Sequence, residues 1–255
     1  MSRVFQRQEE LQLWDQELIS SLTCLVLGAG GLGSTICMDL SRLGVKKIIL
    51  IDMDTVDEHN LNRQILYSKK HIGLLKTDSG LEQLAFHTSG TTVVENYNYD
   101  IIKEWPRTLE FIKQSDVIFN TIDYGDYFDH VICKVAEKYN KPLILGGTEP
   151  FYGHTVSYFL QGIRDKDVKY ADCHDLKTEG ILDETKLEEY SDLSFLPKDS
   201  HPVKGGSTVY SAGTCSHLMV CALTNYMFHL KNSEHPEPPK QFIFNLFVMD
   251  VAKWF

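Results

Sequence analysis

Residues 23–33 read TCLVLGAGGLG, a short apolar run that stops at a glycine-rich turn. An apolar run bounded by glycines is typical of a buried parallel strand, and the turn predicts a helix from about residue 31 to 43, closed by Gly44. A second apolar run, residues 47–51, predicts another strand and ends on Asp52. Strand, glycine turn, helix, strand and acid in this order form a βαβ unit, so this stretch predicts a Rossmann-type α/β fold.

The rest of the chain continues this pattern. We expect further strands at residues 92–98, 116–120, 142–145 and 155–160, one or two strands within 242–254, and helices at 7–22, 126–139 and 209–230. The predicted fold class is α/β: a mostly parallel sheet flanked by helices, with a C-terminal antiparallel extension. Residues 165–206 are polar and interrupted by prolines, which predicts a long crossover loop of the kind that is often functional.

Composition limits the class of protein. The 255 residues are 43% hydrophobic and 24% charged, ordinary values for a soluble globular protein, and we expect one domain over residues 1–255. The net charge of −10 at pH 7 argues against nucleic acid as the main partner, because phosphate binding needs a Lys/Arg surface. An acidic run between Asp183 and Asp192 is interpreted as a solvated face.

No stretch suggests a signal peptide or a membrane span, because the N-terminus lacks an apolar core and no run of about 18 apolar residues occurs. We therefore expect a cytoplasmic protein without a membrane partner. In a reducing compartment the six cysteines should be mostly thiols. No C-x-x-C pair occurs, so the usual signature of a structural zinc site is missing and zinc is doubtful.

The glycine turn has a direct chemical use. Gly28, Gly30 and Gly33 allow a tight turn and a close approach of the backbone to phosphate groups. The helix that follows adds free N–H groups and a partial positive charge. Asp52, at the end of the second strand, suits the hydroxyls of a ribose. These features predict a nucleotide site; a strand–helix turn without any ligand is the alternative.

The residues beyond Asp52 favour a triphosphate over a dinucleotide. They read Asn60-Leu61-Asn62-Arg63-Gln64, followed by Gly73 and Lys76. Arg63 can make forked contacts to phosphate oxygens, and Lys76 is a mobile point charge for the same group. This cluster disfavours an NAD-dependent dehydrogenase, otherwise the commonest interpretation of the glycine turn.

Together these motifs resemble the ThiF/MoeB family, which includes the adenylation domains of ubiquitin-like-protein activating (E1-like) enzymes. The resemblance is dense over residues 3–150 and looser from there to about residue 230. It implies that Asp52 binds the ribose and that Asn60, Arg63 and Lys76 surround the phosphates. The nucleotide-binding set that it implies is Gly28, Gly30, Gly31, Gly33, Asp52, Asn60, Arg63, Gln64 and Lys76.

The resemblance implies two further roles and one difference. Arg7 matches an N-terminal arginine that reaches the ATP bound in the opposite subunit of a homodimer. Asp123 matches the aspartate that organises Mg²⁺ and the attacking carboxylate. Family members commonly carry Asn after this aspartate, whereas this chain carries Tyr124.

The implied activity is that of an E1-like adenylyltransferase that uses ATP and Mg²⁺. The implied substrate is the C-terminal glycine carboxylate of a small ubiquitin-like or sulfur-carrier protein. Residues 1–150 would form the nucleotide-binding half of the domain, and residues 151–255 the carrier-binding half with the crossover loop. The carboxylate would attack the α-phosphate and pyrophosphate would leave, a step that needs positioning and charge neutralisation rather than a side-chain nucleophile.

Whether a thiol step follows is open. Many relatives use a cysteine in the crossover loop before the last long helix, and residues 200–208 contain none. Cys173, beside His174 in a polar loop, is the candidate nucleophile, and an incidental exposed cysteine is the alternative. A zinc site built on these two residues would have too few ligands without others from afar.

Two other functions stay open. The chain could activate a small molecule or a tRNA-linked carboxylate, although the acidic net charge weighs against tRNA. It could also be a non-catalytic pseudo-enzyme subunit that pairs with a catalytic partner. Against the second alternative, every nucleotide-site position that can be placed carries the expected residue type.

Overall fold

A computed structural model describes residues 3–87, 91–149, 153–159, 178, 180–198, 207–231 and 241–244. The strands are β1 (Thr23–Leu27), β2 (Lys47–Ile51), β3 (Val93–Tyr97), β4 (Val117–Asn120), β5 (Leu143–Glu149), β6 (Gly153–Phe159) and β7 (Gln241–Phe244). The α-helices are α1 (Gln6–Glu9), α2 (Gln16–Ile19), α3 (Gly31–Leu43), α4 (Lys76–His87), α5 (Trp105–Gln114), α6 (Asp126–Tyr139) and α7 (Val209–Lys231), and short 3₁₀ turns are η1 (Glu58–Asn60), η2 (Lys69–His71) and η3 (Glu184–Lys186).

The described strands form one sheet in the order β3-β2-β1-β4-β5-β6-β7. The first five in this order run parallel, whereas β6 pairs antiparallel with β5 and β7 antiparallel with β6. The α/β fold with a parallel, Rossmann-type sheet is therefore confirmed. Chain order reverses direction between β1 and β4, and in such sheets the crevice at the carboxyl ends of the two strands is where ligands bind.

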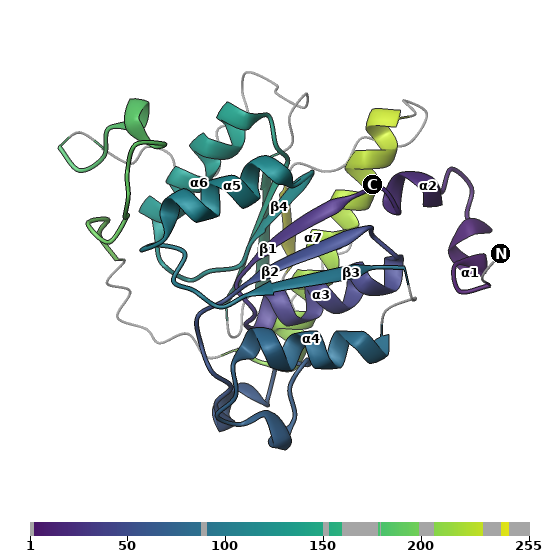
Figure 1. Cartoon of the computed structure of the whole chain (residues 1–255). Coiled ribbons are helices and arrows are strands. Elements are labelled where there is room, and N and C mark those ends of the chain that lie inside the picture. The colour runs from purple at the N-terminus through teal and green to yellow at the C-terminus, as the bar shows by residue number, and fades with distance from the viewer. Residues whose placement is uncertain are drawn as a thin grey trace.

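Helices cover both faces of the sheet (Figure 1). On one face α3, α4 and α7 enclose an apolar core that includes Ile36, Ile48 and Leu223. On the other face α5 and α6 enclose a second core that includes Trp105 and Phe128. Burial of both faces explains why the strands read as continuous apolar runs rather than alternating ones.

Two helices escaped the sequence analysis, and the reason is local. Helix α4 contains Gly80, which lowers its helix propensity. Helix α5 contains Pro106, a residue that usually interrupts helices, but it lies in the first turn, where its missing N–H costs nothing. Both helices form because tertiary packing buries one face of each, including Leu84 in α4 and Leu109 in α5. No helix among the described residues is both long and apolar enough to span a membrane.

The N-terminal segment differs from the expected single helix over 7–22. It forms two four-residue helices, α1 and α2, separated by Leu13 with a left-handed φ of 67°. Asp15 starts α2 by accepting a hydrogen bond from the Leu18 amide (2.9 Å). Trp14, Leu18 and Leu22 pack against the core, as their spacing suggests, whereas Leu11 is 57% exposed. The left-handed residue and the new cap, rather than a lack of apolar contacts, divide the segment into two short helices.

The acidic side chains between Asp183 and Asp192 are exposed, as the interpretation of a solvated face expects, but the segment that carries them is also anchored by apolar burial. Residues 180–198, called the strap here, lie against α5 and α6 and bury four leucines in their core: Leu182, Leu187, Leu193 and Leu196. The Trp105 indole donates a hydrogen bond to the Leu187 carbonyl (2.7 Å). Apolar burial therefore anchors a segment whose charges alone suggested a solvent-facing loop.

Two glutamates of the strap also contact basic side chains of α6. Glu184 lies 2.7 Å from His130 Nε2 and 3.6 Å from Lys134 Nζ, and Glu188 pairs with Lys138. Burial would raise the pKa of the Glu184 carboxyl, but the hydrogen bond with His130 and the positive charge of Lys134 outweigh it, so this pKa lies below its ordinary value.

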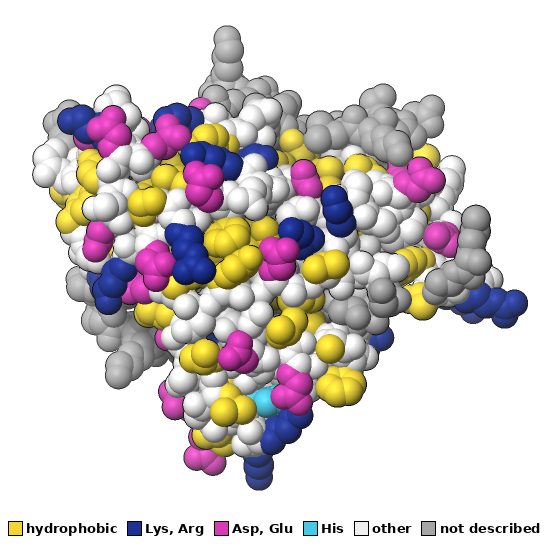
Figure 2. Space-filling model, viewed as in Figure 1, with side chains coloured by type: hydrophobic (Ala, Val, Ile, Leu, Met, Phe, Trp, Pro, Cys, Tyr) yellow, Lys and Arg dark blue, Asp and Glu magenta, His cyan; other side chains and the backbone are white. Residues whose placement is uncertain are grey.

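On the face drawn in Figure 2, acidic and basic side chains are interspersed rather than gathered in a basic patch.

Candidate functional site

The glycine turn joins β1 to α3 at the carboxyl edge of the sheet. Gly28 has a φ of +97°, a conformation that L side chains rarely adopt, and a Cβ at this position would meet Thr121 Oγ1 at 2.8 Å. A Cβ on Gly33 would lie only 1.9 Å from the Gly28 carbonyl oxygen. Glycine is thus required at both ends of the turn, because the first turn of α3 packs directly on the end of β1. The first amide groups of α3 point outward without intrahelical partners.

Asp52 lies beside this turn, where the sequence placed it. Its Oδ2 accepts a hydrogen bond from the Ala29 amide (2.6 Å), and its Oδ1 accepts one from the Asp54 amide (2.7 Å). The side chain is only 9% exposed, and two backbone donors hold its orientation. Each carboxylate oxygen keeps a second lone pair, so the group can still accept from hydroxyls at its open side.

Lys76 stands at the start of α4 and is only 6% exposed. Its ammonium lies 2.7 Å from Asp54 Oδ2, two residues beyond Asp52 along the chain. A cation so deeply buried needs a counter-charge, and the half-exposed carboxylate of Asp54 supplies it. A phosphate group could serve the same ammonium in its place.

Arg63 and Gln64 border the glycine turn from the loop after β2. The stem of Arg63 lies along Gly31, 3.6 Å from the place of a Cβ there, while its Nη1 donates to the His59 carbonyl (3.1 Å). Gln64 is buried with its amide nitrogen facing Gly30, and its Oε1 has no hydrogen-bond partner among the described residues. A buried amide oxygen without a partner is the kind of group that a ligand satisfies.

Asn60 has a structural task in this geometry. It is 5% exposed, and its Oδ1 accepts from the Asp57 amide (3.0 Å), which completes a capping box at η1. The loop that carries Arg63 and Gln64 therefore starts from a fixed turn. Asn60 lies in the same loop as Arg63 and Gln64, and its side-chain hydrogen bond is made within this loop.

Asp123 lies in the loop between β4 and α6, at the same edge of the sheet, and its side chain is exposed. Thr121, two residues before it, donates from Oγ1 to the Leu27 carbonyl (2.8 Å) and approaches the Gly28 carbonyl (3.1 Å). The loop is thereby joined to the glycine turn. Among the described residues, no three His, Cys, Asp or Glu side chains gather as a metal site would require.

Two residues of this site were missed by the sequence analysis. Thr121 follows the end of a buried strand, a position whose polar side chains commonly face the crevice, so a signal was present. Tyr67 gave no such signal: it is buried, and its hydroxyl donates to the Ala29 carbonyl (2.8 Å) inside the glycine turn. Burial, with the charges of Asp52 and Asp54, raises the pKa of this hydroxyl far above its ordinary value, so it keeps its proton and donates.

Arg7 does not join this cluster. Its helix α1 lies at the far end of α3, where Gln8 donates to the Leu43 carbonyl (3.2 Å) and the Phe5 ring packs against Gly44. The Arg7 side chain is 94% exposed and contacts Glu10 at 3.2 Å. The candidate nucleophile Cys173 lies outside the described residues.

The described cysteines are placed as packing residues, with one exception. Cys24, Cys37, Cys133 and Cys215 are buried, and Cys221 is exposed on α7. Burial raises the pKa of the Cys24 and Cys37 thiols well above the ordinary range and that of Cys215 to about 12. Such thiols are protonated at neutral pH and unsuited to nucleophilic attack.

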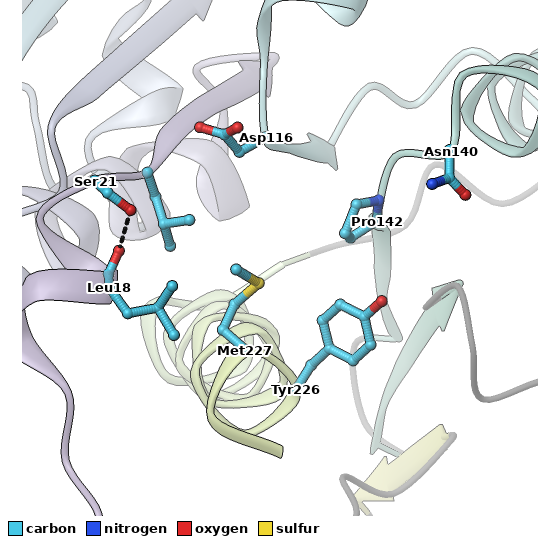
Figure 3. A pocket seen from close by; sticks show the side chains of 8 residues that line it. Leu18, Ser21, Asp116, Asn140, Pro142, Tyr226 and Met227 are labelled. Carbon is cyan, nitrogen blue, oxygen red and sulfur yellow. Dashed lines mark hydrogen bonds between the residues drawn. The ribbon is translucent and has the colours of Figure 1, made fainter. Parts of the chain in front are cut away.

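A pocket of about 380 Å³ lies at the opposite edge of the sheet, where β1, β4 and β5 begin (Figure 3). Leu18, Pro142, Tyr226 and Met227 form its apolar walls, and Asp116 is its charged group. Its described lining contains no lysine or arginine, so it does not suit a triphosphate.

Comparison with known proteins identifies the family of this chain. The model of the ThiF family matches residues 5–250 of the chain. The chain belongs to the ThiF family. Its match to the SUMO-activating enzyme subunit uba-2 of Caenorhabditis elegans is 31% identical over 148 residues, covering 57% of this chain and 24% of that protein. A probable molybdopterin-synthase adenylyltransferase of Porphyra purpurea is 31% identical over 178 residues, covering 69% of this chain and 44% of that protein.

Solved structures of the same fold include PaaA and the MccB protein of E. coli. MccB superimposes with a TM-score of 0.69 at 19% identity, covering 94% of this chain and 65% of that one. PaaA gives a TM-score of 0.66 at 19% identity, covering 92% and 72%. These likenesses establish the fold. This ThiF-family chain spans less than half the length of the curated relatives named above.

Proposed function

We propose that this ThiF-family chain uses ATP and Mg²⁺ to adenylate the C-terminal glycine carboxylate of a small ubiquitin-like or sulfur-carrier protein. The observation that carries the proposal is that Asp52 and Arg63 border the glycine turn, while Lys76 pairs with Asp54, two residues after Asp52. A carboxylate that can accept from ribose hydroxyls, together with two cationic side chains and a helix N-terminus, suits a nucleoside triphosphate. The names of the relatives, a SUMO-activating subunit and a molybdopterin-synthase adenylyltransferase, support the substrate class.

Each group at the turn has a distinct part in ATP binding. The Asp52 carboxylate accepts from the ribose hydroxyls, and the free amides of α3 donate to phosphate oxygens. Arg63, whose stem already lies along Gly31, turns its guanidinium to the phosphates. Lys76 exchanges Asp54 for a phosphate oxygen. The unpartnered Gln64 Oε1 fits this view, because a bound ligand or its water would satisfy it.

The reaction needs no side-chain nucleophile. A carboxylate oxygen attacks the α-phosphorus, the bond from this phosphorus to the bridging oxygen breaks, and pyrophosphate leaves with the electron pair. Arg63 and Lys76 offset the negative charge that develops on the leaving group. Asp123 is the side chain that we assign to Mg²⁺, which is held mainly by one or two carboxylates and by phosphate oxygens, and which would neutralise phosphate charge when bound.

Arg7 can act only on the site of another protomer. Helix α3 has 13 residues and is therefore about 20 Å long, with the glycine turn at one end and α1 at the other. This is far longer than an arginine side chain. A homodimer in which α1 of one copy reaches the glycine turn of the other would explain why the Arg7 guanidinium is left in solvent.

Adenylation can be followed by transfer of the carrier protein to a cysteine thiol. The Cys173 thiolate would attack the acyl carbon of the acyl-adenylate, forming a thioester and releasing AMP. Cys173→Ser tests this step alone. It should leave ATP–pyrophosphate exchange intact and abolish any carrier adduct that thiols cleave, and an adduct that persists would exclude this cysteine.

The main test is ATP–pyrophosphate exchange with purified candidate carriers that end in Gly-Gly. We expect exchange only with a matching carrier, and loss of it in Asp123→Ala but not in the matched control Glu58→Ala, another exposed acid at this end of the molecule. ATP binding without exchange for any carrier would favour a small-molecule substrate, a tRNA-linked carboxylate or a pseudo-enzyme subunit. Absence of ATP binding would overturn the proposal.

A further inference from the structure

The loop that carries Asp123 has two anchors, one on each side of the carboxylate. On the N-terminal side, Thr121 binds the carbonyls of Leu27 and Gly28 and ties the loop to the glycine turn. Asn120, at the end of β4, adds support because its Oδ1 accepts from the Ile122 amide (3.3 Å). Hydrogen bonds therefore join the Asp123 loop to the glycine turn.

On the C-terminal side, the anchor is Tyr124. Its ring stands edge-on to Phe128 of α6, with 5.9 Å between centroids, and Lys198 Nζ lies 4.9 Å from the centre of the ring. Burial, with the charges of Asp100 and Asp192, raises the pKa of the Tyr124 hydroxyl. Phe128 of α6 and Lys198 of the strap thus both contact the ring of this tyrosine.

Lys198 is the last residue of the strap, and the strap itself is firmly held. The Leu193 amide donates to the Ile102 carbonyl (2.9 Å), in the segment that leads from β3 to α5. The buried leucines and the Trp105 bond to Leu187 hold the rest of it. A lysine on such a base can restrain the ring beneath it, whereas one on a free chain could not.

Lys198 and Ser207 lie at different sides of the candidate site. Lys198 contacts Tyr124, whereas the Ser207 carbonyl accepts from the side chain of Asn62, next to Arg63 (3.1 Å). Helix α7 then brings Ala212 against Gly31, 3.3 Å from the place of a Cβ there.

We propose that Tyr124 is a positioning residue that couples the Asp123 loop to the strap, so that Asp123 takes its working position only while Lys198 and Phe128 hold the tyrosine ring. The inference rests on the proposed function, because it assumes that Asp123 serves Mg²⁺ and the attacking carboxylate. It assigns the strap a role in catalysis, since release of the strap would loosen Asp123. It also gives a reason for Tyr124 at a position where the family resemblance leads one to expect Asn.

Three variants and one matched control separate this role from a general effect on folding. Tyr124→Phe keeps the ring, Tyr124→Ala removes it, and Lys198→Met removes the charge above it. Lys113→Met is the control, because Lys113 lies over Tyr139 of α6 at 5.4 Å and 3.9 Å from Glu188 of the strap. It therefore removes a cation–ring contact and a strap ion pair that both lie away from Asp123. Lys198 is exposed, so its variant is expected to fold even if the Ala variant does not.

The first readout is backbone amide hydrogen exchange, which needs no enzymatic activity. We expect Tyr124→Ala and Lys198→Met to accelerate exchange in residues 121–125 and at the Leu193 amide, with α3 unchanged. Tyr124→Phe and Lys113→Met should match the parent chain. Unchanged protection in both the Ala and the Met variants, or equal loosening by Lys113→Met, would overturn the coupling.

The second readout is ATP–pyrophosphate exchange as a function of Mg²⁺ concentration. Misplacing Asp123 should lower kcat about tenfold in Tyr124→Ala and raise the Mg²⁺ concentration for half-maximal rate, without a matching change in the KM for ATP. A purely structural tyrosine would leave the Mg²⁺ dependence unchanged. If the parent chain shows no exchange with any carrier, the proposed function fails, while the amide measurement still decides whether Tyr124 couples loop and strap.

Discussion

The substitution Gly33→Ala tests the geometry of the glycine turn most directly. A methyl group at this position would lie 1.9 Å from the Gly28 carbonyl oxygen and 2.9 Å from its carbon. Ordinary carbon–oxygen contacts are about 3.3 Å, so the two backbones must separate by about 1.4 Å. Neither partner is a flexible side chain, and the first turn of α3 must therefore move away from the end of β1.

This movement has a cost in stability and a larger cost in function. Overpacking of a rigid contact lowers the free energy of unfolding by about 3 kcal/mol or more, and in a chain of this size each kcal/mol lowers Tm by about 2–4 °C. Displacing the amides of α3 by more than about 1 Å should slow adenylation about 100-fold. The Ala29 amide, which holds Asp52, moves with the turn, so ATP affinity should fall too.

Three measurements test this prediction: thermal unfolding, calorimetric ATP binding and ATP–pyrophosphate exchange. Gly30, in the same glycine turn, provides the control. A Cβ on Gly30 would meet nothing nearer than the Gln64 amide nitrogen at 4.0 Å, the end of a flexible side chain. Gly30→Ala should therefore retain the fold and unfold close to the Tm of the parent chain, which makes it the control for stability. The reasoning is refuted if Gly33→Ala unfolds within about 2 °C of the parent chain and binds ATP equally well.

Three further predictions follow from buried and charged groups. Tyr67→Phe leaves the Ala29 carbonyl without its donor and should lower the free energy of unfolding by about 1 kcal/mol in chemical denaturation, whereas an unchanged value would mean that water replaces the hydroxyl. Lys76→Met should abolish exchange activity while the exposed-lysine control Lys69→Met keeps it, and equal activity in both would remove the lysine from the mechanism. Because the pKa of Glu184 is lowered in the folded protein, its stabilising effect is present above the unfolded value of about 4.3 and is lost as pH falls through the folded value. Unfolding measured from pH 6 down to pH 3 should therefore show a smaller loss of stability in Glu184→Gln than in the parent chain, and parallel curves would contradict this.

Local sequence was sufficient for the elements whose patterns arise from short-range physics. The run before Gly28 is apolar on both faces because a central parallel strand is buried on both, and α3 ends at Gly44 because its φ of +80° suits glycine. Helices α6 and α7 formed close to their expected bounds. The prediction of one helix over residues 7–22 failed because apolar spacing does not reveal the left-handed backbone of Leu13 or the new helix start at Asp15.

The sequence by itself determined the βαβ unit, the edge of the sheet at which a nucleotide site would lie, and the residue types that suit phosphate and ribose, since all of these depend on residues close together in the chain. Only the tertiary structure decided which of those residues meet. In the folded chain Asn60 caps a 3₁₀ turn, and Arg7 lies one helix length away from the glycine turn of its own chain. Tyr67 and Thr121 both contact the glycine turn. The tertiary structure also folded the strap onto α5 and α6, placing Lys198 above Tyr124. Contacts between residues far apart in sequence depend on how whole elements pack, and no local pattern carries that information.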